Sequence, residues 1–326
     1  MRGAHGRHAL RSLHSVDRRW ESRLRTGRCG LRVPRVRRCG SGWAEGDSAV
    51  PGSGGASAVR ETVRTSLVTG GSSGIGAATA RALARHGHRV WITYRRGRDA
   101  AAAVVADLET CSRGLGHAAF PLDHLRPHGI RSLLAALPGP VDVLVANAAV
   151  GTASVRTQAN EAGRDEVFFR VNCLGPLGLV RELVPGMVNR GWGKVVLVSS
   201  VGGGVAAFPG FDYADGMSKA AIAYLTRHLA AELAHDPVDV FCACPGATDT
   251  PMLRASTLDH LDDSGRRGLI RRLPDGRLVH PDEIGELIAW LCGDSARVLR
   301  GAVLDASLGL GVHPGLLTAT DPAARR

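Results

Sequence analysis

A glycine turn between an apolar run and a helical pattern constrains the fold more than any other part of this 326-residue chain. The apolar run ends at Val68, glycines follow at Gly70, Gly74 and Gly76, and an alanine-rich helical pattern continues to about Arg85. Glycines let the backbone approach a pyrophosphate closely, and a helix N-terminus offers free N–H groups and partial positive charge. The segment therefore predicts a dinucleotide site, although glycine turns also join strands to helices for purely structural reasons.

Strand and helix patterns alternate along most of the chain. Apolar runs predict strands at 66–69, 89–93, 117–120, 141–146, 195–198, 238–243 and 302–305. Helical patterns lie between them at 75–86, 98–109, 128–136, 164–189, 216–235 and 281–292. Apolar strands separated by helices indicate a parallel sheet covered on both faces, and right-handed crossovers make it doubly wound. We therefore expect a single Rossmann-type α/β domain over residues 61–315.

The ends of the chain differ in composition from this domain. Residues 1–60 hold 13 Arg, no Lys and four acids, so they carry +9 of the formal +11 and leave the remainder nearly neutral. They show no sustained apolar period, which predicts disorder, and residues 316–326 form a short C-terminal tail. Three interpretations of the basic segment compete: a transit-like peptide, an arm that touches polyanions, or upstream sequence outside the working protein. We favour the third, and expect no nucleic-acid partner for the domain.

The cysteines and the hydropathy indicate the cellular compartment in which the protein works. The seven cysteines are odd in number, and their spacings fit neither a zinc site nor a disulfide framework. Cys242 and Cys244 lie in a predicted strand, where buried thiols are expected. No apolar run reaches the roughly 18 residues that a membrane span needs. These features predict a cytoplasmic protein without a metal or a membrane partner.

Further motifs follow the glycine turn in a fixed order. They are Thr69-Gly70 to Ile75-Gly76, Ala146-Asn147-Ala148-Ala149, Asn172 in Val-Asn-Cys-Leu-Gly, Ser199-Ser200, Ser218-Lys219-Ala220-Ala221 and Pro245-Gly246-Ala247-Thr248-Asp249-Thr250. From about Thr62 to Gly311, the chain resembles the short-chain dehydrogenase/reductase family. One departure is that Ala146 and Ala149 replace the first Asn and the Gly of the family's N-N-A-G.

The resemblance implies a catalytic set and a cofactor-binding set. Asn172, Ser200 and Lys219 match the family's water-holding asparagine, carbonyl-orienting serine and lysine. The cofactor set is Gly70, Ser72, Ser73, Gly74, Ile75, Gly76, Tyr94, Arg95, Arg96, Asp123, His124, Asn147, Ala148, Lys219, Pro245, Gly246, Thr248 and Thr250. Residues 250–276 fall at the family's substrate loop, and a solvated surface insertion is the alternative.

The end of the second predicted strand bears on cofactor choice. An enzyme that prefers NAD usually carries an acid there, which binds the ribose 2′-hydroxyl. This chain has Tyr94, followed by Arg95 and Arg96. Guanidinium groups bind a 2′-phosphate bidentately, so the sequence favours NADP(H) over NAD(H). The alternative is that these arginines form only a solvated turn.

The family's catalytic tyrosine is missing from its usual place. Four residues before Lys219 stands Asp215, whereas Tyr213 lies six residues before Lys219 and 13 after Ser200, the family's usual interval. If the helix begins at Asp215, Tyr213 lies in the loop before it and can reach the site, and we favour this arrangement. Asp215 is the alternative donor, but a carboxyl with a pKa of about 4 needs unusual burial to act as an acid at pH 7. A helical Asp215–Lys219 ion pair is the structural alternative.

Three functions follow from these observations. The first is an NADPH-dependent oxidoreductase acting on a small-molecule carbonyl or secondary alcohol, as a homo-dimer or homo-tetramer. The second keeps the fold and dinucleotide site but performs lyase or isomerase chemistry, or only binds dinucleotide. The third is a polyanion-binding protein that acts through its basic segment. We favour the first.

Overall fold

A seven-stranded parallel sheet forms the centre of the computed structural model, which describes residues 63–158, 160–208 and 211–313. The strands are β1 (Thr65–Val68), β2 (Arg89–Tyr94), β3 (Ala118–Pro121), β4 (Val143–Ala146), β5 (Gly193–Val198), β6 (Val238–Pro245) and β7 (Val303–Ala306). Their order is β3-β2-β1-β4-β5-β6-β7, and every neighbouring pair is parallel. The predicted doubly wound α/β fold is confirmed. The order reverses between β1 and β4, where such folds open a crevice for ligands.

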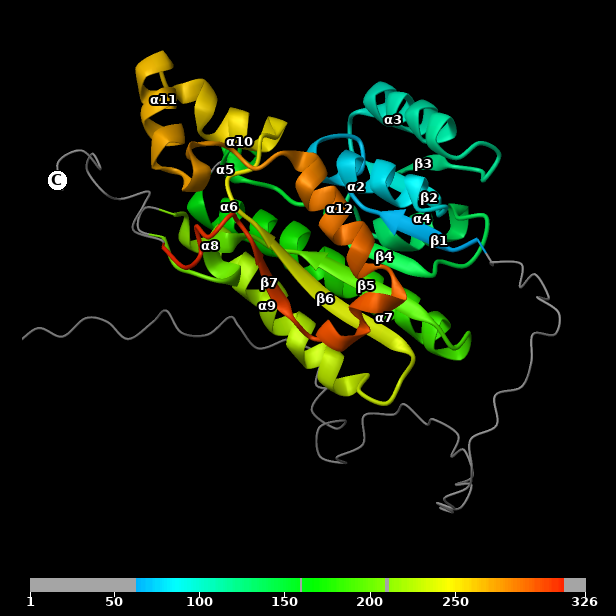
Figure 1. Cartoon of the computed structure of the whole chain (residues 1–326). Helices are drawn as coiled ribbons and strands as arrows, with labels where there is room; N and C mark the ends of the chain where they lie inside the picture. Colours follow the sequence, from blue (N-terminus) through cyan, green and yellow to red (C-terminus); the bar gives the residue numbers. More distant parts are fainter. Residues whose placement is uncertain (1–62, 159, 209–210, 314–326) are drawn as a thin grey trace, which may run out of the picture. The chain divides into compact units, whose positions relative to one another are not determined.

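Helices cover both faces of the sheet (Figure 1). The α-helices are α2 (Gly74–Arg85), α3 (Arg98–Cys111), α4 (Gly129–Ala136), α5 (Thr152–Val155), α6 (Glu161–Phe169), α7 (Gly175–Asn189), α8 (Val201–Gly204), α9 (Tyr213–Glu232), α10 (Pro251–Ser256), α11 (Asp263–Arg272) and α12 (Pro281–Leu291). A π-helical turn, η1 (Arg170–Leu174), joins α6 to α7. Short 3₁₀ turns are η2 (Leu258–His260), η3 (Pro274–Gly276) and η4 (Asp294–Leu299).

Two apolar cores lie on opposite sides of the sheet because successive strand residues point to opposite faces. In β1, Val68 packs with side chains of α2, α3 and α12, whereas Leu67 packs with side chains of α4, α7 and α9. Both residues are fully buried. The two-sided burial explains why the strands read as continuously apolar runs.

Two sequence-based boundaries differ from the structure. The helix expected over 164–189 is divided by η1 into α6 and α7. The helix expected to begin near Asp215 begins at Tyr213, because the side chain of Asp212 caps it and accepts a hydrogen bond from the Asp215 N–H at 3.0 Å. Asp212 and Asp215 are both residues of the N-cap type, and the sequence alone did not separate them.

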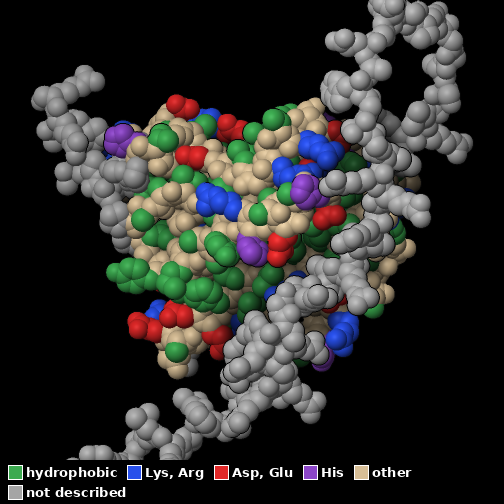
Figure 2. Space-filling view, turned by 90° about the horizontal axis from the view of Figure 1, so that it is seen from below, with side chains coloured by type: hydrophobic (Ala, Val, Ile, Leu, Met, Phe, Trp, Pro, Cys, Tyr) green, Lys and Arg blue, Asp and Glu red, His purple; other side chains and the backbone are tan. Residues whose placement is uncertain are grey.

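The surface of the domain agrees with its nearly neutral charge. On the face that Figure 2 shows, basic and acidic side chains are interspersed. Among the described residues, no helix is both long and apolar enough to cross a membrane. The predicted disorder of residues 1–60 and the predicted C-terminal tail at residues 316–326 concern segments outside the described residues.

Candidate active site

The predicted glycine turn leaves the N-terminus of α2 open to an anion. Gly70 and Gly74 have φ of +66° and +53°, in the left-handed region that favours glycine. A Cβ on Gly76 would lie 2.3 Å from the Gly70 carbonyl oxygen, so only glycine permits this packing. Ser73, the N-cap of α2, makes no side-chain capping hydrogen bond. The first N–H groups of this helix are therefore free of that competitor for a phosphate, which fits a dinucleotide.

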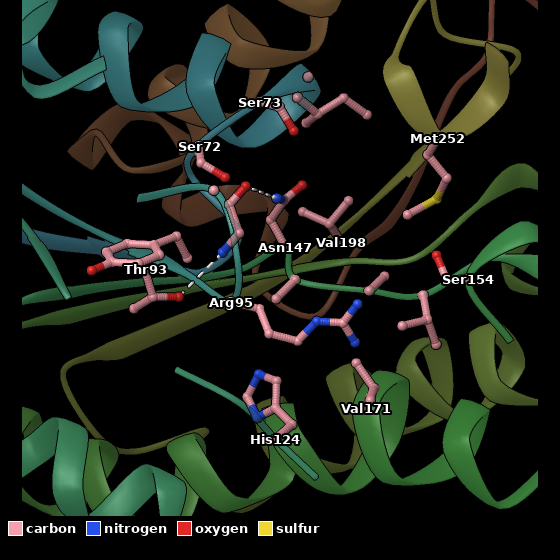
Figure 3. A pocket seen from close by; sticks show the side chains of 18 of the residues that line it. Ser72, Ser73, Thr93, Arg95, His124, Asn147, Ser154, Val171, Val198 and Met252 are labelled. Carbon is pink, nitrogen blue, oxygen red and sulfur yellow. Dashed lines mark hydrogen bonds between the residues drawn. The ribbon is translucent and has the colours of Figure 1, made fainter. Parts of the chain in front are cut away.

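Thr69 and Asn147 join the ends of β1 and β4 around this turn. The Thr69 hydroxyl oxygen accepts hydrogen bonds from the N–H groups of Asn147 and Ala148, at 3.0 and 2.9 Å. The Asn147 side-chain amide donates to the carbonyl oxygen of Gly70 at 3.3 Å, one of the dashed lines in Figure 3. Our sequence analysis did not assign Thr69 to the site, although its place in the T-G motif was a usable signal.

A cleft of about 360 Å³ opens at this edge of the sheet and brings most of the predicted cofactor residues together. Those that line it are Gly70, Ser72, Ser73, Gly74, Ile75, Tyr94, Arg95, Arg96, Asp123, His124, Asn147, Ala148, Lys219 and Thr250. Sequence reasoning missed others that also line it: Thr93, Gly97, Leu122, Ala149, Val150, Ser154, Val171, Val198, Ser199, Pro251 and Met252. Met252 lies in the segment 250–276 that the resemblance places at the substrate loop, whereas Ser154 comes from a segment without a motif, so no local pattern could have identified it.

Arg95 and His124 both line the cleft. Figure 3 shows the Arg95 side chain extended across the cleft, above the His124 ring. Burial lowers the pKa of His124 to about 4, so its imidazole is neutral at pH 7. Its Nδ1 is buried without a hydrogen-bond partner among the described residues and faces Gly175, where a Cβ would lie 2.6 Å away. Arg95 is thus the charged group of this pair, and its position suits an anionic part of a ligand.

Four predicted cofactor residues do not line the cleft but shape its edge. Gly76 packs under the glycine turn, as described above. Pro245 ends β6, and a Cβ on Gly246 would lie 2.7 Å from the Cβ of Ser307. The Thr248 hydroxyl donates to the Gly246 carbonyl oxygen at 3.0 Å. These contacts fix the turn that carries Thr250 to the start of α10.

Asn172 lies in the π-helical turn η1 and is 2% exposed. Its side-chain oxygen accepts from the Val150 N–H at 2.9 Å, and its Nδ2 donates to the Val150 carbonyl at 3.2 Å and to the Ser218 hydroxyl at 3.0 Å. The Ser218 hydroxyl donates in turn to the Asp215 carbonyl oxygen at 2.7 Å. Single π-helical turns within helices are frequent at functional sites, and this one ties the segment after β4 to α9.

The two serines after β5 make different contacts. Ser199 lines the cleft, and its hydroxyl donates to the Lys219 carbonyl oxygen at 2.8 Å. Ser200 is the N-cap of α8, and its hydroxyl oxygen accepts from the Gly202 N–H at 3.2 Å. Ser200, which the resemblance assigned to catalysis, is half-buried and does not line the cleft.

The placement of Tyr213 in a loop before the helix is wrong. Tyr213 is the first residue of α9, is 90% exposed, and does not line the cleft. The cap at Asp212 gives Tyr213 helical geometry. Tyr213 lies two positions before Asp215, which turns its side chain by about 200° to the opposite side of the helix. Asp215, the alternative proton donor, is buried and is not among the residues that line the cleft either.

Asp215 and Lys219 lie one turn apart on the buried face of α9, 8% and 9% exposed. Burial raises the pKa of the Asp215 carboxyl above its usual range, and the charge of Lys219 opposes this shift. Burial likewise lowers the pKa of the Lys219 ammonium, opposed by Asp215. Lys219 lines the cleft, and the Asp215 Oδ1 atom is buried with no hydrogen-bond partner in the described ranges.

Two predictions about cysteines and metals can also be compared with the structure. Cys242 and Cys244 are both fully buried, as predicted, with their Sγ atoms 3.7 Å apart. Over the described ranges, no group of three or more His, Cys, Asp and Glu residues is placed to hold a metal ion.

Comparisons with known proteins identify the family of this chain. Residues 70–311 match a family model described as enoyl-(acyl carrier protein) reductase. The chain is 32% identical over 248 residues to the oxidoreductase UcpA of Escherichia coli K12, covering 74% of this chain and 91% of that protein. It is 32% identical over 250 residues to an acetoacetyl-CoA reductase of Shinella zoogloeoides, covering 76% and 98%.

A solved structure gives the same result for the fold. A single-residue variant of actinorhodin polyketide ketoreductase with NADPH has a TM-score of 0.67 and 29% identity, and the match covers 76% of this chain and 97% of that one. The chain belongs to the short-chain dehydrogenase/reductase family. It is an NAD(P)-dependent oxidoreductase of this family.

Proposed function

We propose that this protein is an NADPH-dependent reductase that converts a small-molecule carbonyl into a secondary alcohol. The observation that carries the proposal is the cleft itself, which is lined by the glycine turn, Arg95 and Lys219. The cofactor, when bound, supplies a hydride to the substrate carbon. The similarity to an acetoacetyl-CoA reductase and to a ketoreductase structure with NADPH supports the direction of reduction.

Arg95 supports the preference for NADPH. It follows β2, where an acid would favour NAD, and its guanidinium extends into the cleft (Figure 3). A charge-assisted hydrogen bond contributes about 1.5–3 kcal/mol, which corresponds to roughly 10–150-fold in affinity. We therefore expect NADPH to bind at least tenfold more tightly than NADH.

Lys219, Asn172 and a serine after β5 have proposed roles in the reduction. Lys219 binds and orients the nicotinamide end, because its ammonium lies on the cleft wall. Asn172 holds η1 against α9 through Ser218 and can order a water there. A serine after β5 orients the substrate carbonyl. The family resemblance assigns this to Ser200, while Ser199 is the serine that lines the cleft.

Cofactor titration with a matched pair of variants tests the preference. NADPH and NADH are titrated against tryptophan fluorescence in the wild type, in Arg95→Ala, and in Arg98→Ala. Arg98 is an exposed residue that does not line the cleft. Arg95→Ala should weaken NADPH binding at least tenfold and leave NADH binding unchanged, while Arg98→Ala should change neither. Equal affinities for the two cofactors in the wild type would refute the preference.

Turnover tests the reaction. NADPH oxidation is followed at fixed enzyme with a panel of β-ketoacyl thioesters, ketones and aldehydes. Consumption of NADPH with one of these carbonyl compounds is the expected result. No turnover across the panel, with NADPH still bound, would favour the second function, in which the altered residue at position 215 supports non-redox chemistry or dinucleotide binding alone.

A further inference from the structure

The chain has two lysines, Lys194 and Lys219, and the structure gives their amino groups opposite surroundings. Lys194 is held by polar partners in the interior, whereas Lys219 lines the cleft. We propose that Lys219 gives this protein an activity beyond the reduction: its side-chain amine forms a reversible imine with a small aldehyde or ketone that enters the cofactor-free cleft.

Lys194 illustrates a lysine that cannot react in this way. Its side chain is 2% exposed, and its Nζ donates to Asp239 at 2.8 Å and to the Gly293 carbonyl oxygen at 3.0 Å. A carboxylate oxygen of Asp294 lies 3.7 Å from the same atom. An ammonium held by hydrogen bonds and opposite charge keeps its proton and has no lone pair to offer a carbonyl carbon.

The amino group of Lys219 has no such partners among the described residues. Of their ion pairs within 4.0 Å, two involve Lys194 and none involves Lys219. The backbone carbonyl of Lys219 accepts from the Ser199 hydroxyl, which fixes the start of its side chain. Its Nζ is not among the buried polar atoms that lack a partner, so this atom keeps access to the open volume of the cleft.

The cleft suits an uncharged carbonyl compound beside Lys219. Val150, Val171 and Val198 line it as well, so part of its wall is apolar. Its volume of about 360 Å³ admits a small aldehyde without displacing any element of the fold. A lysine that is poorly solvated by water in an apolar pocket is the usual setting for imine formation.

The surroundings of Lys219 increase the share of its amine form. Burial lowers the pKa of its ammonium. Four groups face it with charges that act in the opposite direction: Asp215 on α9, Cys173 on η1, and Cys242 and Cys244 on β6. Burial raises the pKa of the Cys173 thiol to about 11 and that of the Asp215 carboxyl above its usual range, which weakens their opposition.

The proposed step balances without an oxidant or a reductant. The lone pair of the Lys219 amine bonds to the carbonyl carbon, and the π electron pair moves onto oxygen. Proton transfer through solvent water from nitrogen to oxygen gives a carbinolamine. The C–O bond then breaks, water leaves with a second proton from nitrogen, and the nitrogen lone pair forms the C=N bond. Addition of water reverses every step.

Reductive trapping in the wild type tests the inference. The protein without cofactor is incubated at pH 7 with propanal and sodium cyanoborohydride, which reduces an imine to a stable secondary amine, and peptide mass mapping locates the adducts. Lys219 should be labelled at least about tenfold faster than Lys194, which is the matched internal control, and faster than Nα-acetyl-lysine. Lys219→Arg should lose this adduct.

A denatured sample shows whether the fold causes the selectivity. In guanidinium chloride the two lysines should be labelled at similar rates, because both are then in water. Labelling of Lys219 in the folded protein that is no faster than that of Lys194 or of Nα-acetyl-lysine would overturn the inference. A preference for Lys219 that persists in denaturant would also overturn it.

Saturating NADPH separates this inference from the proposed function, which places the nicotinamide end beside Lys219. NADPH should slow the labelling of Lys219 at least about tenfold. Selective labelling that bound NADPH does not slow would keep the imine site and contradict that placement of the cofactor. Loss of selectivity in an enzyme that still reduces carbonyl compounds with NADPH would overturn the inference and leave the reductase function in place.

Discussion

The stability of the Asp215→Asn variant relative to wild type is expected to increase as pH rises. Burial raises the folded-state pKa of this carboxyl above the unfolded value of about 3.9. Between these two pKa values the folded protein keeps a proton that the unfolded chain has released. Wild-type stability therefore falls as pH rises through that interval and levels off above the folded-state pKa. The asparagine side chain has no titratable proton, so the folding stability of the variant lacks this pH dependence.

The size of the effect follows from the burial of the side chain. At 8% exposure, solvent screens the Asp215 carboxylate little, and its Oδ1 atom has no partner among the described residues. The slope cannot exceed about 1.4 kcal/mol per pH unit for one group. A domain of 150–250 residues changes its Tm by roughly 2–4 °C per kcal/mol. The Tm of Asp215→Asn relative to wild type should thus rise by up to about 3–6 °C per pH unit across the interval.

Thermal melts from pH 4 to pH 9, at constant ionic strength and without cofactor, measure this difference. Asp165→Asn makes the same chemical change at an exposed carboxyl and should show no such trend. A Tm difference between Asp215→Asn and wild type that does not change with pH would refute the reasoning.

Three other predictions concern parts of the chain other than Asp215. Gly76→Ala should weaken NADPH binding at least tenfold and destabilise the fold by about 1–3 kcal/mol, measured by fluorescence titration and melting, because its Cβ would lie 2.3 Å from the Gly70 carbonyl oxygen. Asp239→Ala should cost about 3–5 kcal/mol in urea unfolding, because it leaves the buried Lys194 ammonium without its partner at 2.8 Å; a loss below 1 kcal/mol would contradict this. A chain that begins near Ala58 should melt within a few degrees of the full chain, and a large fall in Tm would show that the removed segment packs on the domain.

The sheet was predictable because its signal is local. Each strand is buried on both faces, so each reads as a short apolar run, and the helices between them fix the parallel direction. The division of the 164–189 helix by η1 was not predictable in this way. Its residues Arg170–Leu174 keep an ordinary helical pattern, and the hydrogen bonds of Asn172 to Val150 and Ser218 reach across the fold.

The cofactor half of the site was more predictable than the catalytic half. The glycine turn, Arg95 and Asn147 belong to contiguous motifs that end strands of a parallel sheet, and such ends meet at one edge. The position of Tyr213 depends instead on which of two aspartates caps α9. Asp212 and Asp215 are equally suitable cap residues, and the choice shifts the helix start by enough to turn the tyrosine away from the cleft.

Substitutions in the cofactor half and in the catalytic half of the site should therefore have separable effects. Arg95 and the α2 N-terminus line the cleft, whereas Asp215 is buried on α9, one turn before Lys219, and does not line it. A change at Arg95 is therefore expected to act on cofactor binding, and a change at Asp215 on the buried face of α9 and on Lys219. Additivity holds for distant sites without shared partners, so the effects of Arg95→Ala and Asp215→Asn on kcat/KM should add as free energies within about 0.5 kcal/mol. Strong coupling between them would contradict this separation and would indicate that Asp215 influences cofactor placement through Lys219.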